Sequence, residues 1–386
     1  MKPSSAKPSV CFVALSGYNV ISGVGETGHI GGAEVQQAVM SRWLIDNGYS
    51  VSFVTYDHGQ REAVTGSGVR VFIAYDRDRG WPGLRFFFPR WSGLWSAMRR
   101  TNADIYYQRG AGIETGLCAL WCWLKGKTFI YGSANDRDLA RSLPYLKNRR
   151  EKLLYRLGLR LANAVITQTK TQQVLLKDSF EISSHIVRNS GWLPSAQQSD
   201  STSARSILWV GRFIRLKRLE FLLDVAEANQ DYRFVIVGSG DEKLPYVQGL
   251  LARASSLSNV ELKGHVPYQK MLSYYQEASI VCSTSSQEGF PNVFVEAWST
   301  GTPVLSTLDP DRIITQSGAG WVAGTVDEFQ VILDKLLVDE SKLIAAKDAA
   351  LMLYNKSYCV SANMPKFESI VISIFKARIL QRSGET

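Results

Sequence analysis

Two glutamates, Glu288 and Glu296, are separated by seven residues in the second half of this 386-residue chain. The segment between them opens with residues suited to the start of a ligand-binding helix, namely Gly289, Phe290, Pro291, Asn292 and Val293. Proline suits the first turn of a helix, where backbone N–H groups point at a bound sugar or phosphate. We therefore expect Glu288 in a loop at the mouth of a site and Glu296 about one turn inside the helix.

The spacing of the two glutamates also bears on the kind of reaction. On a single helix they would lie about 12 Å apart, at about 1.5 Å per residue. The carboxylate pair of a glycosidase stands roughly 5–10 Å apart across one scissile bond. The spacing therefore argues against a hydrolase. An ordinary loop followed by a surface helix is the alternative interpretation of the segment.

A basic cluster follows a strand expected at 207–210. Gly211 and Arg212 follow this strand directly, and Lys217 lies five residues after Arg212. From one loop and helix start, the fork of Arg212 and the point charge of Lys217 can converge on a diphosphate. Arg215 and Arg218 make a solvated basic helix start an equally good interpretation.

Glycines stand at two further expected strand ends. Gly31 and Gly32 precede a helix expected at 34–46, and Gly238 begins a Gly-Ser-Gly turn after a strand expected at 234–237. Glycine lets backbone N–H groups approach a phosphate at a helix N-terminus. A plain turn is the alternative for each of these positions.

Short β-branched and aromatic runs alternate with helical patterns along the chain, which predicts βαβ units and parallel sheets. Residues 195–204, rich in Ser, Gln and Asp, separate two such series. We therefore predict the α/β class, with two doubly wound Rossmann-like domains at 1–195 and 196–363 that face each other across a cleft. A helix at 364–386 is expected to pack back on the first domain. Ligands of such sheets bind at the C-terminal strand ends, so the cleft is the expected site.

Charge is distributed unevenly over the chain, whose net charge is +9. Residues 1–195 contain 25 Lys and Arg against 14 Asp and Glu, whereas residues 196–386 contain 19 against 21. The first half is therefore expected to meet an anionic partner. At 81–91 aromatic residues alternate with arginines, which suits either an anionic membrane surface or packing of the phenylalanines into the first core. No nucleic-acid-binding module accompanies the charge, so nucleic acid is not an expected partner.

Cysteine usage and hydropathy bear on the compartment. The five cysteines are odd in number, which favours a reducing cytoplasm. Cys118 and Cys122 stand four apart, but no second pair completes a zinc set, so we expect no metal. No signal segment is recognised, and no apolar run reaches the roughly 20 residues of a membrane span. We expect a cytoplasmic protein that binds the membrane face peripherally, if at all.

Taken in chain order, these motifs resemble the retaining family-four glycosyltransferases, which have the GT-B fold. The resemblance rests on Gly31-Gly32-Ala33-Glu34, on Gly211-Arg212 with the later Lys217, on Gly238-Ser239-Gly240, on Gly264-His265-Val266-Pro267, and on the segment from Glu288 to Glu296. It covers nearly the whole chain, is strongest over residues 205–307 and is weak over 57–160.

The resemblance implies a role for each motif residue. Arg212 and Lys217 would hold the diphosphate of a nucleotide-sugar donor, of the UDP or GDP type. Glu288 would bind the hydroxyls of the transferred sugar, and Glu296 those of the ribose. The remaining donor-binding positions would be Gly31, Gly32, Gly238, Val266, Gly289, Phe290, Pro291, Asn292 and Val293. No metal or other cofactor is implied, because cationic side chains and helix N-termini can stabilise the leaving diphosphate.

One position departs from the family pattern. Members commonly carry a histidine after the strand expected at 128–131, close to the reacting sugar, whereas Asn135 is the nearest match here. Asparagine can hydrogen-bond a sugar hydroxyl but cannot act as a base at neutral pH. Arg109, at another expected strand end, would hold an anionic acceptor or form a structural salt bridge. The expected catalytic residues are Glu288, Arg212, Lys217 and Asn135.

The implied function is a retaining, metal-independent glycosyltransferase of the hexosyltransferase type. Its acceptor would be a glycan or a lipid-linked molecule, in the synthesis of cell-surface polysaccharide or glycolipid. Two alternatives stay open. A sugar-nucleotide epimerase or hydrolase on a similar fold would consume donor with no acceptor present. A catalytically idle partner subunit of another transferase would explain the missing histidine.

Overall fold

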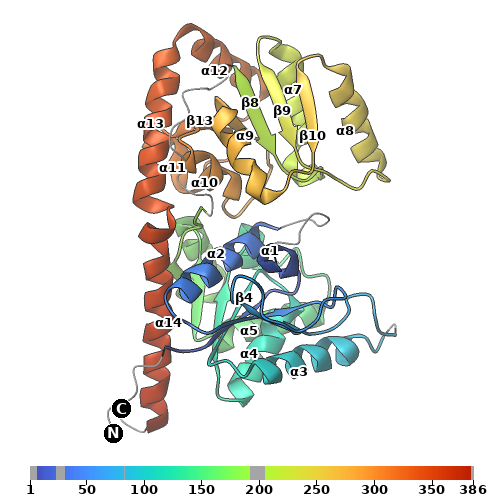
Figure 1. Cartoon of the computed structure of the whole chain (residues 1–386), viewed down its shortest axis with the longest axis vertical. Helices are drawn as coiled ribbons and strands as arrows, with labels where there is room; N and C mark the ends of the chain where they lie inside the picture. The colour runs from blue at the N-terminus through green and yellow to red at the C-terminus, as the bar shows by residue number, and fades with distance from the viewer. Residues whose placement is uncertain (1–6, 23–30, 82, 192–204, 384–386) are drawn as a thin grey trace. The chain divides into compact units, whose positions relative to one another are not determined.

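The computed structural model describes residues 7–22, 31–81, 83–191 and 205–383 (Figure 1). The chain divides into two compact units. Unit 1 comprises Met1–Arg188 and Asn363–Thr386, and unit 2 comprises Asn189–Ala362. The linker expected at 195–204, and with it the expected domain boundary, lies outside the described residues.

Unit 1 contains a seven-stranded sheet in the order β3-β2-β1-β4-β5-β6-β7, in which all neighbours pair in parallel. The strands are β1 Val10–Val13, β2 Val51–Thr55, β3 Arg70–Ile73, β4 Ile105–Arg109, β5 Thr128–Gly132, β6 Ala164–Thr167 and β7 His185–Ile186. The helices are α1 Tyr18–Ser22, α2 Gly32–Asp46, α3 Ser92–Thr101, α4 Ile113–Leu124, α5 Arg149–Leu161, α6 Lys170–Phe180 and the C-terminal α14 Val360–Ser383. Figure 1 shows α1 and α2 on one face of this sheet and α3, α4 and α5 on the other. The order of the strands reverses between β1 and β4, which is where such sheets bind their ligands.

The inner strands of unit 1 are buried and rich in apolar residues because helices cover both faces of the sheet. All four residues of β1 and all five of β2 are buried. The ring of Phe12 stacks on Phe53 at a centroid distance of 5.1 Å and meets Tyr107 edge-on at 5.4 Å. A strand buried on two sides shows no polar alternation, and this explains the sequence pattern that predicted a parallel sheet.

Helix α14 leaves unit 2 near its start and packs against unit 1 from Asn363 onward. The ring of Phe367 lies 5.7 Å from Tyr107. The Glu368 carboxylate accepts hydrogen bonds from Trp43 Nε1 at 3.0 Å and from the Tyr49 hydroxyl at 2.9 Å. The last part of the chain therefore completes the core of the first unit. The helix begins four residues before the expected position 364.

Unit 2 contains a six-stranded parallel sheet in the order β10-β9-β8-β11-β12-β13. The strands are β8 Ser206–Val210, β9 Arg233–Val237, β10 Val260–Gly264, β11 Ile280–Ser283, β12 Val304–Ser306 and β13 Gly320–Val322. The helices are α7 Leu219–Ala228, α8 Pro245–Ser256, α9 Met271–Glu277, α10 Asn292–Ser299, α11 Ile313–Ser317, α12 Val326–Val338 and α13 Glu340–Ser357. The order again reverses in the middle of the sheet, between β8 and β11.

The predicted fold class is confirmed, since each unit is a doubly wound, Rossmann-like α/β sheet. The sequence pattern did not indicate β7 and β13, which have two and three residues. Strands this short carry no periodic signal, and they are held at the sheet edges by pairing with β6 and β12.

Candidate active site

The C-terminal ends of the strands in unit 2 bring together the predicted acidic and basic residues. The Lys217 ammonium forms an ion pair with the Glu288 carboxylate, although the two residues are 71 positions apart in the chain. Both side chains are about one-fifth exposed, at 22% and 20%. The pair is therefore partly shielded from water but open to a ligand. This contact brings the motif of Lys217 and the motif of Glu288 to one place.

The loop that carries Lys217 is held by a threonine that sequence reasoning missed. The buried Thr284 hydroxyl donates to the Lys217 carbonyl at 2.7 Å and accepts from Trp209 Nε1 at 3.0 Å. The Ser286 backbone N–H donates to the Leu216 carbonyl at 2.9 Å. The loop after β11 thus fixes the loop after β8, which places the lysine beside Glu288. A single threonine among serines gives no sequence signal for this role.

The other cations near Lys217 have different surroundings. Arg215 lies over the ring of Tyr246 and Arg218 over that of Phe221, each with its guanidinium carbon 4.7 Å from the centroid. Arg212 is exposed, and among the described residues its side chain has no hydrogen-bond or ion-pair partner. Arg212 is therefore available to an anion at this edge, whereas Arg215 and Arg218 cover aromatic rings.

Gly238 has a packing role at the same edge. Its φ is +150°, and a Cβ atom there would stand 1.8 Å from the Gly211 carbonyl oxygen. The Gly238 N–H donates to the Gly264 carbonyl at 2.8 Å. That N–H is consequently occupied within the protein. Only glycine fits here, because the backbones at the ends of β8 and β9 lie too close together to leave room for a side chain.

The segment after Glu288 enters α10 as predicted, with Pro291 immediately before the first helical residue, Asn292. No side chain caps this end of the helix, and the Phe294 N–H donates to the Pro291 carbonyl at 3.2 Å. The N-terminal end of a helix attracts anionic groups through its backbone dipoles. The Asn189 amide donates to Asn292 Oδ1 at 2.8 Å and to the Phe290 carbonyl at 3.2 Å. Asn189, buried and distant in sequence, was not predicted.

Phe290 differs from its predicted surroundings. Its ring is buried and stacks on Tyr358 at 5.2 Å, within a cluster that includes Phe294 and Trp298. Pro291 and Gly289 are also buried, and Val293 is half-buried against the same cluster. The side chains of this segment therefore hold the helix start in the core, and its backbone is the part suited to bind a ligand.

Glu296 is a buried carboxylate held by tyrosines. The Tyr275 hydroxyl donates to Glu296 Oε2 at 2.5 Å, and the Tyr268 hydroxyl also interacts with this carboxyl. Burial raises the pKa of Glu296 above its usual range, while the two hydroxyls and the charge of Lys217 offset part of that rise. Val266, the residue expected near a nucleotide base, is half-buried and packs against the cluster that also contacts Tyr268.

In unit 1, Gly31 precedes α2 in an extended conformation, and no side chain caps the helix. Gly32 is the first helical residue. The helix start therefore has the features predicted for a phosphate-binding turn. The residues immediately before it, 23–30, lie outside the described part of the chain.

Asn135 and Arg109 are engaged within unit 1. The Asn135 side chain accepts from the Arg137 N–H at 3.0 Å and so caps the short helix Asp136–Leu139. The Asp138 carboxylate accepts from the Ala134 and Asn135 N–H groups. Burial raises the pKa of Asp138, and the charge of Arg109 offsets part of that rise.

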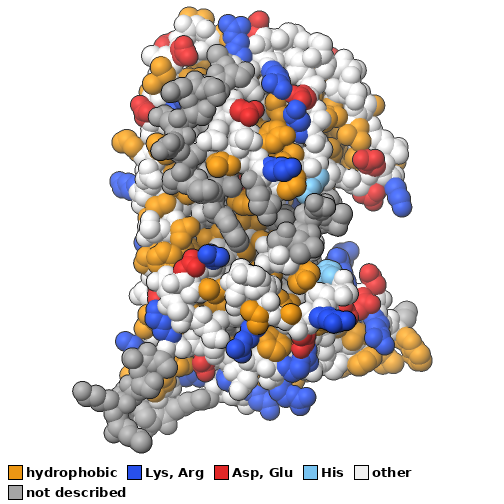
Figure 2. All heavy atoms as spheres, viewed as in Figure 1, with side chains coloured by type: hydrophobic (Ala, Val, Ile, Leu, Met, Phe, Trp, Pro, Cys, Tyr) orange, Lys and Arg blue, Asp and Glu red, His pale blue; other side chains and the backbone are white. Residues whose placement is uncertain are grey.

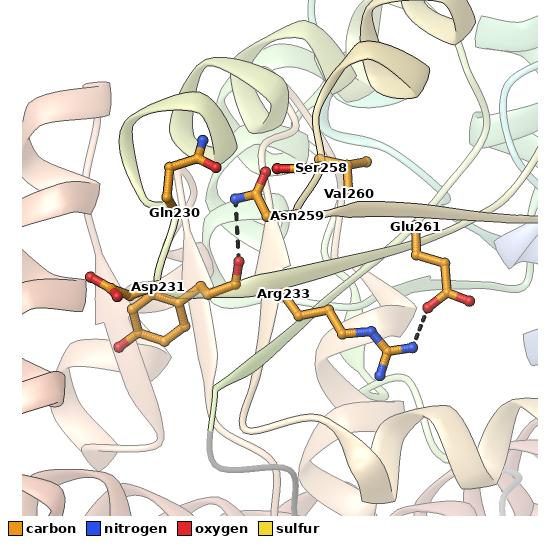
Figure 3. Close-up of a pocket in the computed structure, with 8 residues that line it drawn as sticks. Gln230, Asp231, Arg233, Ser258, Asn259, Val260 and Glu261 are labelled. Carbon is orange, nitrogen blue, oxygen red and sulfur yellow. Dashed lines mark hydrogen bonds and ion pairs between the residues drawn. The ribbon is translucent and has the colours of Figure 1, made fainter.

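A shallow pocket in unit 2 lies away from this site, at the start of β9 and β10 (Figure 3). Arg233 and Glu261 form an ion pair there, and the Asn259 amide donates to the Tyr232 carbonyl at 3.2 Å. These residues stand at the opposite strand ends from Gly211 and Gly238. The pocket therefore belongs to another part of the sheet.

Two further features concern metals and membranes. Within the described ranges, no three His, Cys, Asp or Glu side chains are grouped to hold a metal ion. Cys118 and Cys122 are buried free thiols whose pKa values burial raises well above the usual range. Among the helices that the structure describes, none is long and apolar enough to cross a bilayer.

Comparisons with known proteins agree with this arrangement. Residues 30–189 match the family model described as Glycosyltransferase Family 4, and residues 204–339 match that of Glycosyl transferases group 1. An uncharacterized glycosyltransferase of Haemophilus influenzae is 27% identical over 226 residues, which cover 56% of this chain and 63% of that protein. The amylovoran biosynthesis glycosyltransferase AmsD of Erwinia amylovora is 26% identical over 192 residues, which cover 47% of this chain and 54% of AmsD. The chain thus matches little more than half the length of these relatives.

Solved structures show the same fold. Anabaena HepE, crystallised in complex with UDP and glucose, superposes with a TM-score of 0.73 at 16% identity. The superposition covers 95% of this chain and 100% of that one. At this identity the likeness concerns the fold of the two units.

Proposed function

Because the chain belongs to the group 1 glycosyltransferases of the GT-B type, we propose that it transfers a sugar from a nucleotide-diphosphate sugar to an acceptor hydroxyl, with retention of configuration and without a metal ion. The observation that carries this proposal is the Lys217–Glu288 ion pair beside the uncapped start of α10. A cation and a helix N-terminus suit the charge of a diphosphate, and a carboxylate can accept hydrogen bonds from sugar hydroxyls.

The chemistry assigned to each group follows from where charge develops. The bond between the anomeric carbon and the diphosphate oxygen breaks, and negative charge accumulates on the leaving diphosphate. Lys217, Arg212 and the N–H groups of α10 stabilise that charge in a site partly shielded from water. The acceptor oxygen bonds to the anomeric carbon, and its proton passes to the departing phosphate or to solvent.

Donor binding exchanges one ion pair for two sets of contacts. Without donor, Lys217 neutralises Glu288. When a diphosphate arrives, its charge competes for Lys217, and the released Glu288 oxygens accept hydrogen bonds from the sugar hydroxyls. The pair thus keeps two charged groups oriented in the empty site, which reduces the reorganisation needed on binding.

Glu296 is proposed to receive the ribose. Its carboxylate is buried, and Tyr275 occupies one oxygen, so the remaining acceptor positions suit two neighbouring hydroxyls. The UDP and glucose bound to HepE support a nucleotide-sugar donor of the UDP type for this chain. A GDP donor remains the second choice that a donor screen must test.

The proposed acceptor is a glycan or a lipid-linked sugar, in the synthesis of cell-surface polysaccharide or glycolipid. The name of AmsD, an amylovoran biosynthesis glycosyltransferase, supports a polysaccharide product. We place the protein in the cytoplasm, where nucleotide sugars are the donors, with peripheral contact to the membrane.

A donor screen with product analysis tests the proposal. UDP and GDP sugars are titrated into the full chain by calorimetry, and the donor that binds is then incubated with candidate acceptor glycans. We expect nucleotide release that requires acceptor, and a product whose anomeric configuration by NMR equals that of the donor. Donor consumption without acceptor would indicate an epimerase or hydrolase. Donor binding with no turnover on any acceptor would indicate an idle partner subunit.

A further inference from the structure

A cluster of exposed apolar side chains projects from unit 1 between β3 and α3. Trp81, Leu84, Phe87 and Phe88 are 78%, 60%, 56% and 65% exposed, within eight consecutive positions. We call these four residues the aromatic tip. Single exposed apolar residues are common on protein surfaces, but a group of four large ones marks an interaction site. The sequence left open whether the phenylalanines at 86–88 enter the core. In the structure Phe86 is buried, whereas Phe87 and Phe88 are exposed.

The aromatic tip rests on a packed base. The ring of Trp91 lies 5.5 Å from Phe86, 6.1 Å from Phe87 and 5.2 Å from Trp95. Trp95 Nε1 in turn donates to the Leu117 carbonyl at 3.0 Å. One side of the Phe87 ring packs on this base, at 4.9 Å from Phe86, yet Phe87 is still 56% exposed. The base therefore supports the aromatic tip from below and leaves much of its apolar surface in solvent.

A helix that carries exposed arginines begins beside the segment of the aromatic tip. The Arg150 guanidinium lies 4.0 Å above the Phe86 ring, which places the start of α5 next to the segment. From there Arg149, Leu153, Arg156 and Arg160 follow at helical spacing, and all four are exposed. We call these four residues the α5 stripe. In Figure 2 hydrophobic side chains project at the edge of unit 1 with Lys and Arg side chains close by.

Unit 1 as a whole carries a net positive charge, the same sign as the arginines of the α5 stripe. Residues 1–188 and 363–386 contain 29 Lys and Arg against 16 Asp and Glu, whereas residues 189–362 contain 15 against 19. Unit 1 is therefore cationic and unit 2 is slightly anionic. The apolar cluster and the net positive charge lie on the same unit.

We propose that the aromatic tip and the α5 stripe dock unit 1 on the surface of an anionic phospholipid bilayer. Aromatic side chains partition into the headgroup region, and nearby arginines are attracted to anionic lipids. A second copy of the chain is a poorer occupant, because pairing two such surfaces would bring two arginine stripes together. Docking places the first unit where a lipid-linked acceptor would be found. The surface is argued without reference to the donor site, so its failure would leave the proposed transferase activity untouched.

Vesicle co-sedimentation of the full chain, without donor, tests this surface. We expect binding to vesicles of phosphatidylcholine with phosphatidylglycerol, weak binding to phosphatidylcholine alone, and loss of binding as salt is raised. The double variant F87S/F88S should bind about tenfold more weakly, because less apolar area enters the interface. The double variant R149E/R160E should also bind at least about tenfold more weakly.

Matched controls separate docking from general effects. Met352, on α13 of unit 2, is 67% exposed, so M352S removes a comparably exposed apolar residue. Lys243 and Lys356 are exposed in unit 2, so K243E/K356E makes the same change in net charge as R149E/R160E. Both control variants should bind as the unaltered chain does. Circular dichroism melts confirm that every variant is folded.

Three outcomes would overturn the inference. The first is equal recovery in the supernatant with and without anionic vesicles. The second is unchanged binding of F87S/F88S, which would leave the attraction to charge alone. The third is a dimer in sedimentation equilibrium that these same substitutions dissociate, which would make the aromatic tip an interface between two copies.

Discussion

The two units have the same architecture but use the C-terminal ends of their strands differently. In unit 2 side chains from different segments meet, as Lys217 does with Glu288 and Tyr275 of α9 with Glu296 of α10. In unit 1 the polar residues at that edge serve the local fold, as Asn135 does in capping the helix that follows β5. In the proposed function, unit 2 carries the chemistry of the donor, while the distinctive surface of unit 1 is cationic and aromatic. One fold has been adapted to two tasks through its loops.

The largest effect should come from the backbone contact that shapes the edge of unit 2. Gly238→Ala should lower the free energy of unfolding by about 3–5 kcal/mol, because its Cβ would collide with the Gly211 carbonyl and its φ is unfavourable for alanine. Denaturant unfolding measures the loss. Gly249→Ala is the control, since α8 leaves open space around Gly249 and alanine favours a helix by about 1 kcal/mol. Equal stability of the two variants would show that the contact is not strained.

Next in size is the loss of the charged pair. Lys217→Ala and Glu288→Gln should each lower the turnover number about 100-fold, because each removes an interaction with the reacting donor. Both variants should retain the circular dichroism spectrum of the unaltered protein, since both side chains are partly exposed. Arg215→Ala, which removes a neighbouring cation stacked on Tyr246, should leave turnover near normal. Unchanged turnover in either member of the pair would remove the site from unit 2.

The buried carboxyl of Glu296 should make donor binding depend on pH. Its pKa is raised by burial, and ribose hydroxyls donate to the ionised form, so donor affinity should fall as the pH is lowered from neutral into the acidic range. The raised pKa also means that the native state holds this proton more tightly than the unfolded state. The stability that this proton gives the native state is therefore fully present below the pKa of Glu296 in the unfolded chain. It is lost as the pH rises through the pKa of Glu296 in the folded protein.

Calorimetry across this pH range, compared with the variant Glu296→Gln, checks the prediction. The variant cannot ionise, so its donor affinity should be weaker at neutral pH and nearly independent of pH. A pH dependence as steep in the variant as in the unaltered chain would assign the titration to another group.

A smaller effect is expected at the corresponding edge of unit 1. Asn135→Ala should cost about 1 kcal/mol of stability through loss of the cap, while donor affinity stays unchanged. Asn135→Asp keeps a capping oxygen and should keep the stability. Thermal unfolding and donor calorimetry on the same samples separate the two properties. A loss of donor affinity in Asn135→Ala would contradict the division of tasks between the units.

No effect is expected from chelation. In the proposed mechanism, Lys217, Arg212 and the start of α10 supply the positive charge that a metal would otherwise provide at the diphosphate. Initial rates with EDTA should therefore equal those without it. Activity that disappears with EDTA and returns with Mg²⁺ would show that these groups are insufficient.

Sequence reasoning located the donor motifs but not the residues that support them. Glu288, Lys217 and the start of α10 stood out because their residue types and spacing carry a chemical meaning by themselves. Thr284, Asn189 and Tyr275 did not, because a threonine, an asparagine or a tyrosine in an ordinary context has many uses. Their roles arise from neighbours that are distant in the chain, such as Lys217, which Thr284 holds from 67 positions away.

The sequence by itself determined the fold class and the order of the motifs, because buried parallel strands need apolar runs and strand-end loops need glycines and polar residues. Only the tertiary structure decided how each residue is used. It placed Phe290 in the core and left Phe87 in solvent, although both are phenylalanines in motif-like segments. It directed Lys217 to Glu288 and laid Arg215 on a tyrosine ring. Periodicity is a local property that a sequence records, whereas burial and partnership depend on which distant segments pack together.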